Sequence, residues 1–213
     1  MTRLAALLII VMFFSGCQNS PNQAESFPAL RAANIRSILV LPPTNATTEV
    51  MAPYTYLSSI TRPIAEAGYY VFPVAVIDNF MKENGLADPY EMQQVPLTKL
   101  KAVFNPDAVM YINIEQFGQK FVVISSTTEV KATAKLIDTN TGTQLWQGVA
   151  YAAEGSGDAG GGLGGLVAAA VLEQVLDTVS DRVKDVAAQA NYNLIRHSSR
   201  GLPPGPYRPI PAI

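Results

Sequence analysis

The chain has little of the chemistry that enzymes use, with one cysteine and one histidine in 213 residues. A single cysteine cannot form a disulfide within the chain, and a metal site would have only one imidazole, His197. A Ser-His-Asp site would depend on the same histidine, and the carboxylates are too dispersed to nominate a hydrolase pair. We therefore predict no catalytic site, no metal and no cofactor, and we expect His197 to be exposed to solvent.

Charge is also sparse. Asp, Glu, Lys and Arg make up 15% of the sequence and the net charge is −2, whereas about a quarter of an ordinary domain is charged. The surface is therefore expected to be rich in Ala, Thr, Ser, Gln and Asn, and a partner could cover part of it. Without a basic cluster, the sequence argues against nucleic-acid binding.

No apolar run approaches the roughly 20 residues that cross a bilayer. The longest, Leu4 to Phe14, spans about 11 residues, which is the length of a cleaved signal. It ends in Phe14-Ser15-Gly16-Cys17, which resembles the lipobox of bacterial lipoproteins, although leucine is usual where Phe14 stands. Ser15 and Gly16 are small enough to enter a signal peptidase, and Cys17 would carry the lipid as the first mature residue. The alternative is an ordinary signal peptide or anchor helix with Cys17 incidental.

The predicted signal covers residues 1–16, and the rest of the chain follows it in three parts. We predict a lipidated tether over 17–33, one α/β domain over 34–197 and a Pro-rich, poorly ordered tail over 198–213. By resemblance to other lipoproteins, Gln18 in place of an aspartate favours the outer membrane, with the domain facing the periplasm or the cell surface.

The first half of the domain predicts a βαβ unit. A buried strand is expected at Ile35–Leu41 and a second strand at Tyr69–Val74. Between them, Tyr54–Ala67 has helical periodicity, with a kink or break at Pro63 and a C-cap at Gly68. This order implies two parallel strands.

Shorter elements follow. A helix is expected at Val76–Asn84, an irregular stretch at Leu86–Val95, and a helix at Lys99–Phe104 with Thr98 as its N-cap. A third strand at Asp107–Gln116 is expected to end in a turn at Gly118-Gln119-Lys120.

The second half predicts an antiparallel meander. One long strand lies within Phe121–Asp138, and its strict alternation places Val130, Ala132, Ala134 and Leu136 on one face. The chain returns as Gln144–Ala152, with Leu145, Val149 and Tyr151 on one side and Trp146 on the other. An amphipathic helix over Leu166–Ile195 should then cover one sheet face. The fold class is α/β: a mixed sheet with a βαβ first half, an antiparallel second half and a long C-terminal helix packed on it.

Two features leave alternatives open. Trp146 could fill the core or lie at an interface, because aromatic side chains are enriched at interfaces. The glycine-rich run Glu154–Gly165 lacks the Gly-Lys-Ser/Thr ending of a phosphate-binding loop, so a plain linker is favoured, or a segment that lets the last helix dock on another subunit.

Two motifs carry a family resemblance. A strand that ends in Pro-Pro, Ile35–Pro43, and a hairpin that begins at Lys131 and closes at Asp138–Gly142 follow the lipobox. Together they resemble proteobacterial lipoproteins of unassigned function, including a Neisserial surface lipoprotein antigen, and are similar to the N-terminal domain of the Tol-Pal propeller protein and to the curli-secretion lipoprotein. The resemblance implies a periplasmic domain that docks within an envelope complex and can form a dimer, and it supplies no catalytic residues.

The sequence thus favours an outer-membrane-anchored, non-catalytic docking or structural subunit of an envelope transport or assembly complex. Its expected partners are the membrane, other envelope proteins and a second copy of itself. The alternatives are a ligand-binding lipoprotein, such as a solute receptor, and an envelope hydrolase dependent on His197.

Overall fold

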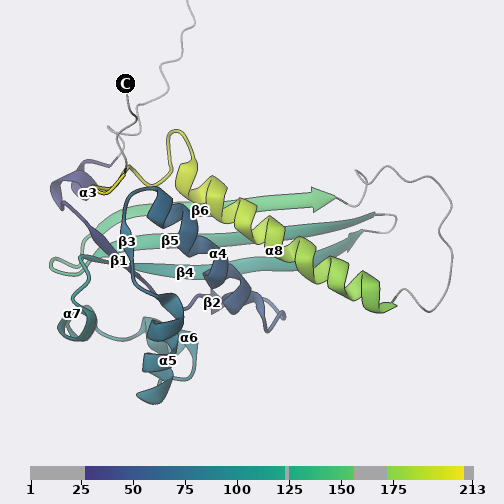
Figure 1. Ribbon diagram of the computed structural model, residues 1–213, viewed down its shortest axis with the longest axis horizontal. Coiled ribbons are helices and arrows are strands. Elements are labelled where there is room, and N and C mark those ends of the chain that lie inside the picture. Colours follow the sequence, from purple (N-terminus) through teal and green to yellow (C-terminus); the bar gives the residue numbers. More distant parts are fainter. Residues whose placement is uncertain (1–26, 123–124, 156–171, 209–213) are drawn as a thin grey trace, which may run out of the picture.

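The computed structural model describes residues 27–122, 125–155 and 172–208. The signal peptide, Phe14 to Cys17 and most of the glycine-rich run lie outside these residues. The described chain forms one mixed sheet with the strand order β3-β1-β4-β5-β6, while β2 pairs with β4 (Figure 1). The strands are β1 (Ser37–Val40), β2 (Thr44–Asn45), β3 (Tyr70–Val71), β4 (Ala108–Val122), β5 (Ser125–Asp138) and β6 (Gln144–Gly155).

The two halves of the sheet differ as the sequence predicts. β1 is parallel to both β3 and β4, and β4, β5 and β6 are antiparallel neighbours. The helices are α3 (Pro28–Ala32), α4 (Ala52–Glu66), α5 (Val74–Glu83), α6 (Pro89–Gln93), α7 (Leu97–Phe104) and α8 (Leu172–Arg196). The mixed α/β fold is therefore confirmed.

Helices α4 and α8 cover one face of the sheet (Figure 1). Alternate strand residues such as Ile112 and Ala132 are buried beneath them. In the described half of α8, the predicted apolar arc is buried at Val186, Ala190 and Leu194. Burial of these apolar side chains is the main stabilising contribution to this layer.

The opposite face is covered only in part. Helices α5, α6 and α7 bury Ile77, Met92 and Leu100 against β1 and the beginning of β4. Farther along the sheet, Lys135 on β5 and Val149 on β6 remain exposed on this face. In the described chain, these positions on the outer face of the antiparallel half are thus open to solvent.

The expected turn at Gly118-Gln119-Lys120 is wrong, because β4 continues through it to Val122, which lies opposite Ser125. Gly118 does adopt a positive φ of 113°, but within the strand. A glycine in a strand often marks an irregularity, and the register of β4 also shifts between Ile114 and Gln116.

Helix α4 is not split at Pro63, which lies in its last turn. A proline there removes only the hydrogen bond to the carbonyl of Ser59. Gly68 ends the helix as predicted: its N–H bonds to Ala65 O, and the next N–H bonds to Ile64 O. These two bonds and the φ of 97° at Gly68 form a Schellman motif.

Several boundaries differ from the predicted ones. α6 lies within the stretch expected to be irregular, and its N-cap Asp88 accepts a 2.6 Å hydrogen bond from the N–H of Tyr90. α7 begins after Pro96, so Thr98 lies inside its first turn and is not the cap. In both helices a proline begins the first turn or precedes it, which is favourable because an N-terminal N–H has no helical partner.

Helix α3 lies within the range predicted as tether, and its Leu30 is buried in the core. The packed structure therefore begins before Asn34. Within the described ranges, no helix has both the length and the apolar character to span a bilayer.

Candidate docking site

The residues considered for catalysis are not brought together. His197 is exposed at the end of α8, where its Nδ1 lies 3.3 Å from the backbone nitrogens of Ser199 and Arg200. In the parts of the chain that the structure describes, no three His, Cys, Asp or Glu side chains are grouped as metal ligands would be. His197 therefore caps local backbone groups at the end of α8.

Trp146 lies in the core with 1% of its surface exposed, so it offers no surface to a partner and the interface alternative is wrong. The register of β6 shifts beside Leu136, which pairs with Trp146, while Ile137 pairs with Gln144. Leu145 is the extra residue, and both Leu145 and Trp146 are buried. Simple alternation along the strand could not reveal this bulge.

The Pro-rich tail is not poorly ordered over residues 198–208, contrary to expectation. Leu202 is 3% exposed, and its N–H bonds to Ile195 O. The carbonyl of Arg200 accepts from Trp146 Nε1 at 3.0 Å, and Pro203 O accepts from the Tyr69 hydroxyl at 2.9 Å. The tail thus joins the end of α8 to β6 and to Tyr69, which directly precedes β3.

Two glycines allow the tail to approach the end of α4. Gly205 N–H bonds to Ala67 O and Tyr207 N–H bonds to Gly68 O. A Cβ at Gly205 would collide with the carbonyl oxygen of Gly68. Because this contact is between backbones, a side chain at Gly205 could not be accommodated without moving the tail.

The strand β6 forms one edge of the sheet. Asn193 Nδ2 on α8 donates to the carbonyl of Tyr151 at 3.4 Å, so this carbonyl points away from β5. Within a strand, the N–H and C=O of one residue point to the same side, and those of its neighbours point to the other. Backbone N–H and C=O groups therefore point to the free edge at alternate residues of β6, which are Gln147, Val149, Tyr151 and Ala153.

A hollow of about 720 Å³ runs beside this edge, and a second of about 360 Å³ adjoins it. Both are bounded by Val149 and Tyr151 of β6 and by the end of α8. Val149 and Tyr151 are 57% and 52% exposed. We call the two hollows, together with the outward side of β6, the β6 groove.

The β6 groove is positively charged. Lys135, Arg196 and Arg200 line it, and none of its lining residues is acidic. The guanidinium of Arg196 lies 5.9 Å from the ring centre of Tyr192. The ion pairs among the described residues involve neither Lys135 nor these arginines, and Arg200 Nη2 lies 3.4 Å from His197 Nε2.

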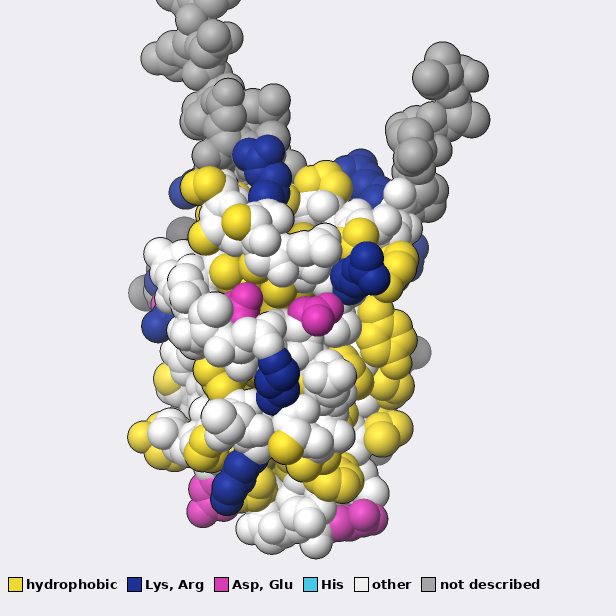
Figure 2. All heavy atoms as spheres, turned by 90° about the vertical axis from the view of Figure 1, so that its left-hand side faces the viewer, with side chains coloured by type: hydrophobic (Ala, Val, Ile, Leu, Met, Phe, Trp, Pro, Cys, Tyr) yellow, Lys and Arg dark blue, Asp and Glu magenta, His cyan; other side chains and the backbone are white. Residues whose placement is uncertain are grey.

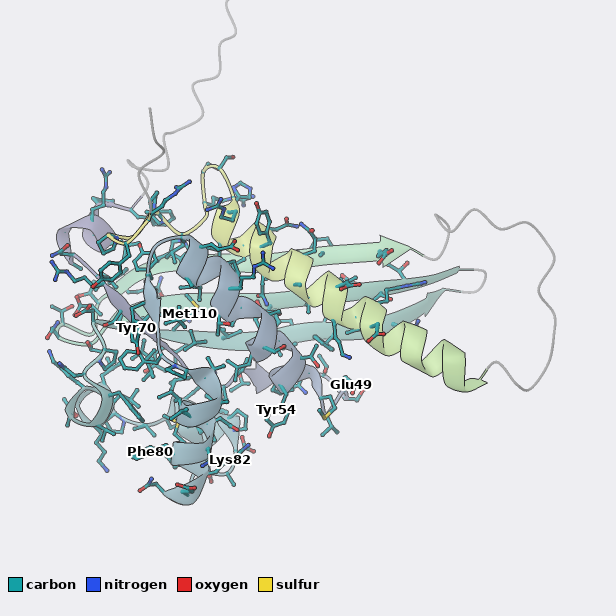
Figure 3. The ribbon with its side chains drawn as sticks, in the orientation of Figure 1. Glu49, Tyr54, Tyr70, Phe80, Lys82 and Met110 are labelled. Atoms are coloured by element: carbon teal, nitrogen blue, oxygen red, sulfur yellow. The ribbon has the colours of Figure 1, made fainter. Side chains whose placement is uncertain are left out.

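Among the described residues, basic side chains elsewhere are dispersed or already partnered where Figures 2 and 3 show them. Figure 2 shows the α3 end of the molecule, where Lys and Arg are dispersed among side chains of other kinds. Lys82 on α5 lies beside Tyr54 on α4 (Figure 3), with Nζ 3.0 Å from the Tyr54 hydroxyl and 2.6 Å from Asp78 Oδ2. The hydrogen bond to Asp78 is the main cause that raises the pKa of Lys82, so this ammonium group is already partnered.

A smaller polar hollow of about 300 Å³ lies beyond the carboxyl end of β1. Thr44, Asn45, Gln93 and Asn113 are among its lining residues. Gln93 Nε2 donates to the carbonyls of Pro42 and Ile112 at 2.9 Å, which fixes its side chain. The sequence analysis missed this hollow because it depends on α6 and β2, neither of which was predicted.

The β6 groove could not be predicted from the sequence. Leu145 was expected on the same side of its strand as Val149 and Tyr151, but Leu145 is buried at the bulge while the other two are exposed. The exposure of Val149 and Tyr151 depends on β6 being an edge strand. Arg196 follows the predicted helix Leu166–Ile195, and Arg200 lies in the tail that was expected to be poorly ordered. Only the folded tail brings Arg200 to the strand.

Comparison with known proteins gives a consistent assignment. The family described as "Putative lipoprotein GNA1162-like" matches residues 26–207. A protein of Neisseria meningitidis serogroup B, "Putative lipoprotein NMB1124/NMB1162", is 36% identical over 200 residues, which cover 93% of each chain. The crystal structure of lipoprotein GNA1162 from Neisseria meningitidis matches with a TM-score of 0.55 and 34% identity, covering 70% of this chain and 99% of that one.

Proposed function

Because the chain belongs to the GNA1162-like lipoprotein family, we propose that it is a non-catalytic docking subunit of an envelope complex, anchored to the outer membrane by a lipid on Cys17. The family confirms the resemblance inferred from the strand and hairpin motifs. A docking role is supported by the long open edge of β6, where Val149 and Tyr151 expose apolar and aromatic surface. Exposed surface of this kind beside unpaired strand groups is typical of an interaction site.

The lipid anchor can be tested by fractionating membranes from cells that express the full chain. Cys17→Ala should release the protein from the outer-membrane fraction without lowering the unfolding midpoint of the domain, because the packed structure begins near α3. Lipid chains contribute about 0.8 kcal/mol per buried methylene, so their loss should abolish stable attachment. Unchanged attachment of Cys17→Ala would contradict the proposal.

The residue after Cys17 tests the choice of membrane. In an enterobacterial host, Gln18→Asp should move the protein to the inner membrane, whereas Gln18→Asn should leave it in the outer membrane. If Gln18→Asp remained in the outer membrane, the assignment made from Gln18 would be wrong.

The docking role is tested by chemical crosslinking in native membranes, followed by size analysis in mild detergent. The full chain should run in a complex larger than its own mass, and the unlipidated Cys17→Ala form should be depleted from that complex. Recovery of the lipidated protein only as a partner-free monomer would contradict a docking subunit.

The polar hollow beside Thr44, Gln93 and Asn113 supports ligand binding as a second candidate function. Ligands often bind beyond the carboxyl ends of parallel strands, and the side chain of Gln93 is already fixed by two hydrogen bonds. A thermal-shift screen of small polar solutes should then show stabilisation that Asn113→Ala removes. A screen with no stabilising solute would count against this candidate.

A further inference from the structure

The β6 groove combines two features that recognise different parts of one partner. The backbone groups of Gln147, Val149, Tyr151 and Ala153 face the free edge of the sheet, and the basic side chains of α8, β5 and the tail surround that edge. We propose that β6 binds an extended acidic segment of another envelope protein, which adds to the sheet as a further strand. This inference rests on the proposed docking function and names the chemistry of the partner.

The backbone of β6 accounts for the extended form of the partner. An added strand would bond to the N–H and C=O groups of Val149 and its alternate neighbours, as in other strand-addition complexes. The carbonyl of Tyr151 is held only by the exposed amide of Asn193, over 3.4 Å. This long contact can be exchanged for a backbone donor at little cost.

The charge of the groove accounts for the acidic side chains. Lys135 lies on the outer face of β5, Arg196 at the end of α8, and Arg200 in the packed tail. A strand beside β6 would pass all three, and its carboxylates would meet positive groups without a competing acidic side chain in the lining. Val149 and Tyr151 would contact the apolar side chains between those carboxylates.

The same charges disfavour two other occupants. A second copy paired through its own β6 would bring the arginines of both copies together, and like charges across an interface are unfavourable. Any homodimer should therefore use another surface. A membrane surface could satisfy the positive charges, but lipid head groups would leave the strand's N–H groups without carbonyl partners in register.

A synthetic strand tests the proposal directly. The probe is the peptide acetyl-Thr-Glu-Val-Glu-Val-Glu-Thr-amide with a neutral fluorophore, and its anisotropy is measured with the full chain in mild detergent. We expect saturable binding below about 1 mM. A peptide with lysine in place of each glutamate tests the charge, and a peptide N-methylated at alternate residues tests strand pairing; both should bind at least about tenfold more weakly.

Matched variants locate the site on the protein. Val149→Pro removes one outward N–H and leaves the ladder to β5 intact, whereas Val149→Thr retains both the N–H and the branched shape. The proline variant should lose at least about tenfold in affinity and the threonine variant should not. Arg200→Glu should also lose at least about tenfold in affinity. The backbone carbonyl at position 200, which accepts from Trp146 Nε1, is retained in this variant. Fluorescence of Trp146 checks that each variant is folded.

Several results would overturn the proposal. The proposal would be wrong if the acidic peptide did not bind, or if the N-methylated or lysine peptide bound equally well. It would also be wrong if the affinity were unchanged in both Val149→Pro and Arg200→Glu. Equal binding of the N-methylated peptide would show a general anion site, as would a preference for phosphatidylglycerol vesicles over the peptide. If the peptide failed while the native complex persisted, the docking function would stand and only the partner chemistry would be wrong.

Discussion

The packed tail can be tested at Leu202, which is 3% exposed in the main core cluster. Leu202→Ala removes roughly three buried methylene or methyl groups, each worth about 0.8 kcal/mol. Buried leucines lose about 2–5 kcal/mol when truncated, depending on how far the site collapses. Because Leu202 lies on a tail that can adjust, we expect a loss of about 2–3 kcal/mol in the free energy of unfolding.

The assay is urea unfolding of the full chain, followed by the fluorescence of Trp146, the only tryptophan. Its Nε1 bonds to the tail at Arg200, so the signal reports tail docking as well as unfolding. Tyr207→Ala is the matched control, because Tyr207 is 60% exposed and contacts Gly68 through its backbone. Tyr207→Ala should change stability by less than about 0.5 kcal/mol, and an equally small effect of Leu202→Ala would refute the packed tail.

Two further predictions concern single polar groups. Burial raises the pKa of Tyr69 to about 12. The contribution of its neutral hydroxyl to the free energy of unfolding is therefore complete below pH 10, and about 2–3 kcal/mol of it is lost as the pH rises through 12. Tyr69→Phe should remove this part of the pH dependence in urea titrations, and a variant with the same slope as the parent would contradict it. Asp107 Oδ2 accepts from the N–H groups of Arg36 and Ser37 at 2.9 Å and from the Ser37 hydroxyl at 3.0 Å. Asp107→Ala should therefore cost about 2–3 kcal/mol in urea unfolding, and Asp107→Asn less because an amide oxygen still accepts; equal losses would show that the acceptor is unimportant.

Where local patterns decide the structure, the sequence was sufficient. Alternation along β5, from Val130 to Leu136, identified the buried face because one side of that strand meets helices and the other meets water. Gly68 was identified as a helix end because its positive φ suits glycine. These features need only neighbouring residues and a general rule.

Where distant contacts decide, sequence reasoning failed. The tail was expected to be poorly ordered because of its prolines, but its order depends on hydrogen bonds to Tyr69 and Trp146, which are far away in the chain. The position of Trp146 depended on a bulge at Leu145 that no local signal marks. The β6 groove depends on both, since it needs an edge strand and a packed Arg200.

The most direct test of the docking account is site-specific photocrosslinking in native membranes. A photoreactive residue is placed at Val149 in the β6 groove or, as a control, at Val76 on α5, which is 61% exposed on another part of the surface. If a partner docks in the β6 groove, position 149 should give a discrete adduct with another envelope protein that Arg200→Glu weakens, and position 76 should give none. No adduct from Val149, or the same adduct from both positions, would contradict it.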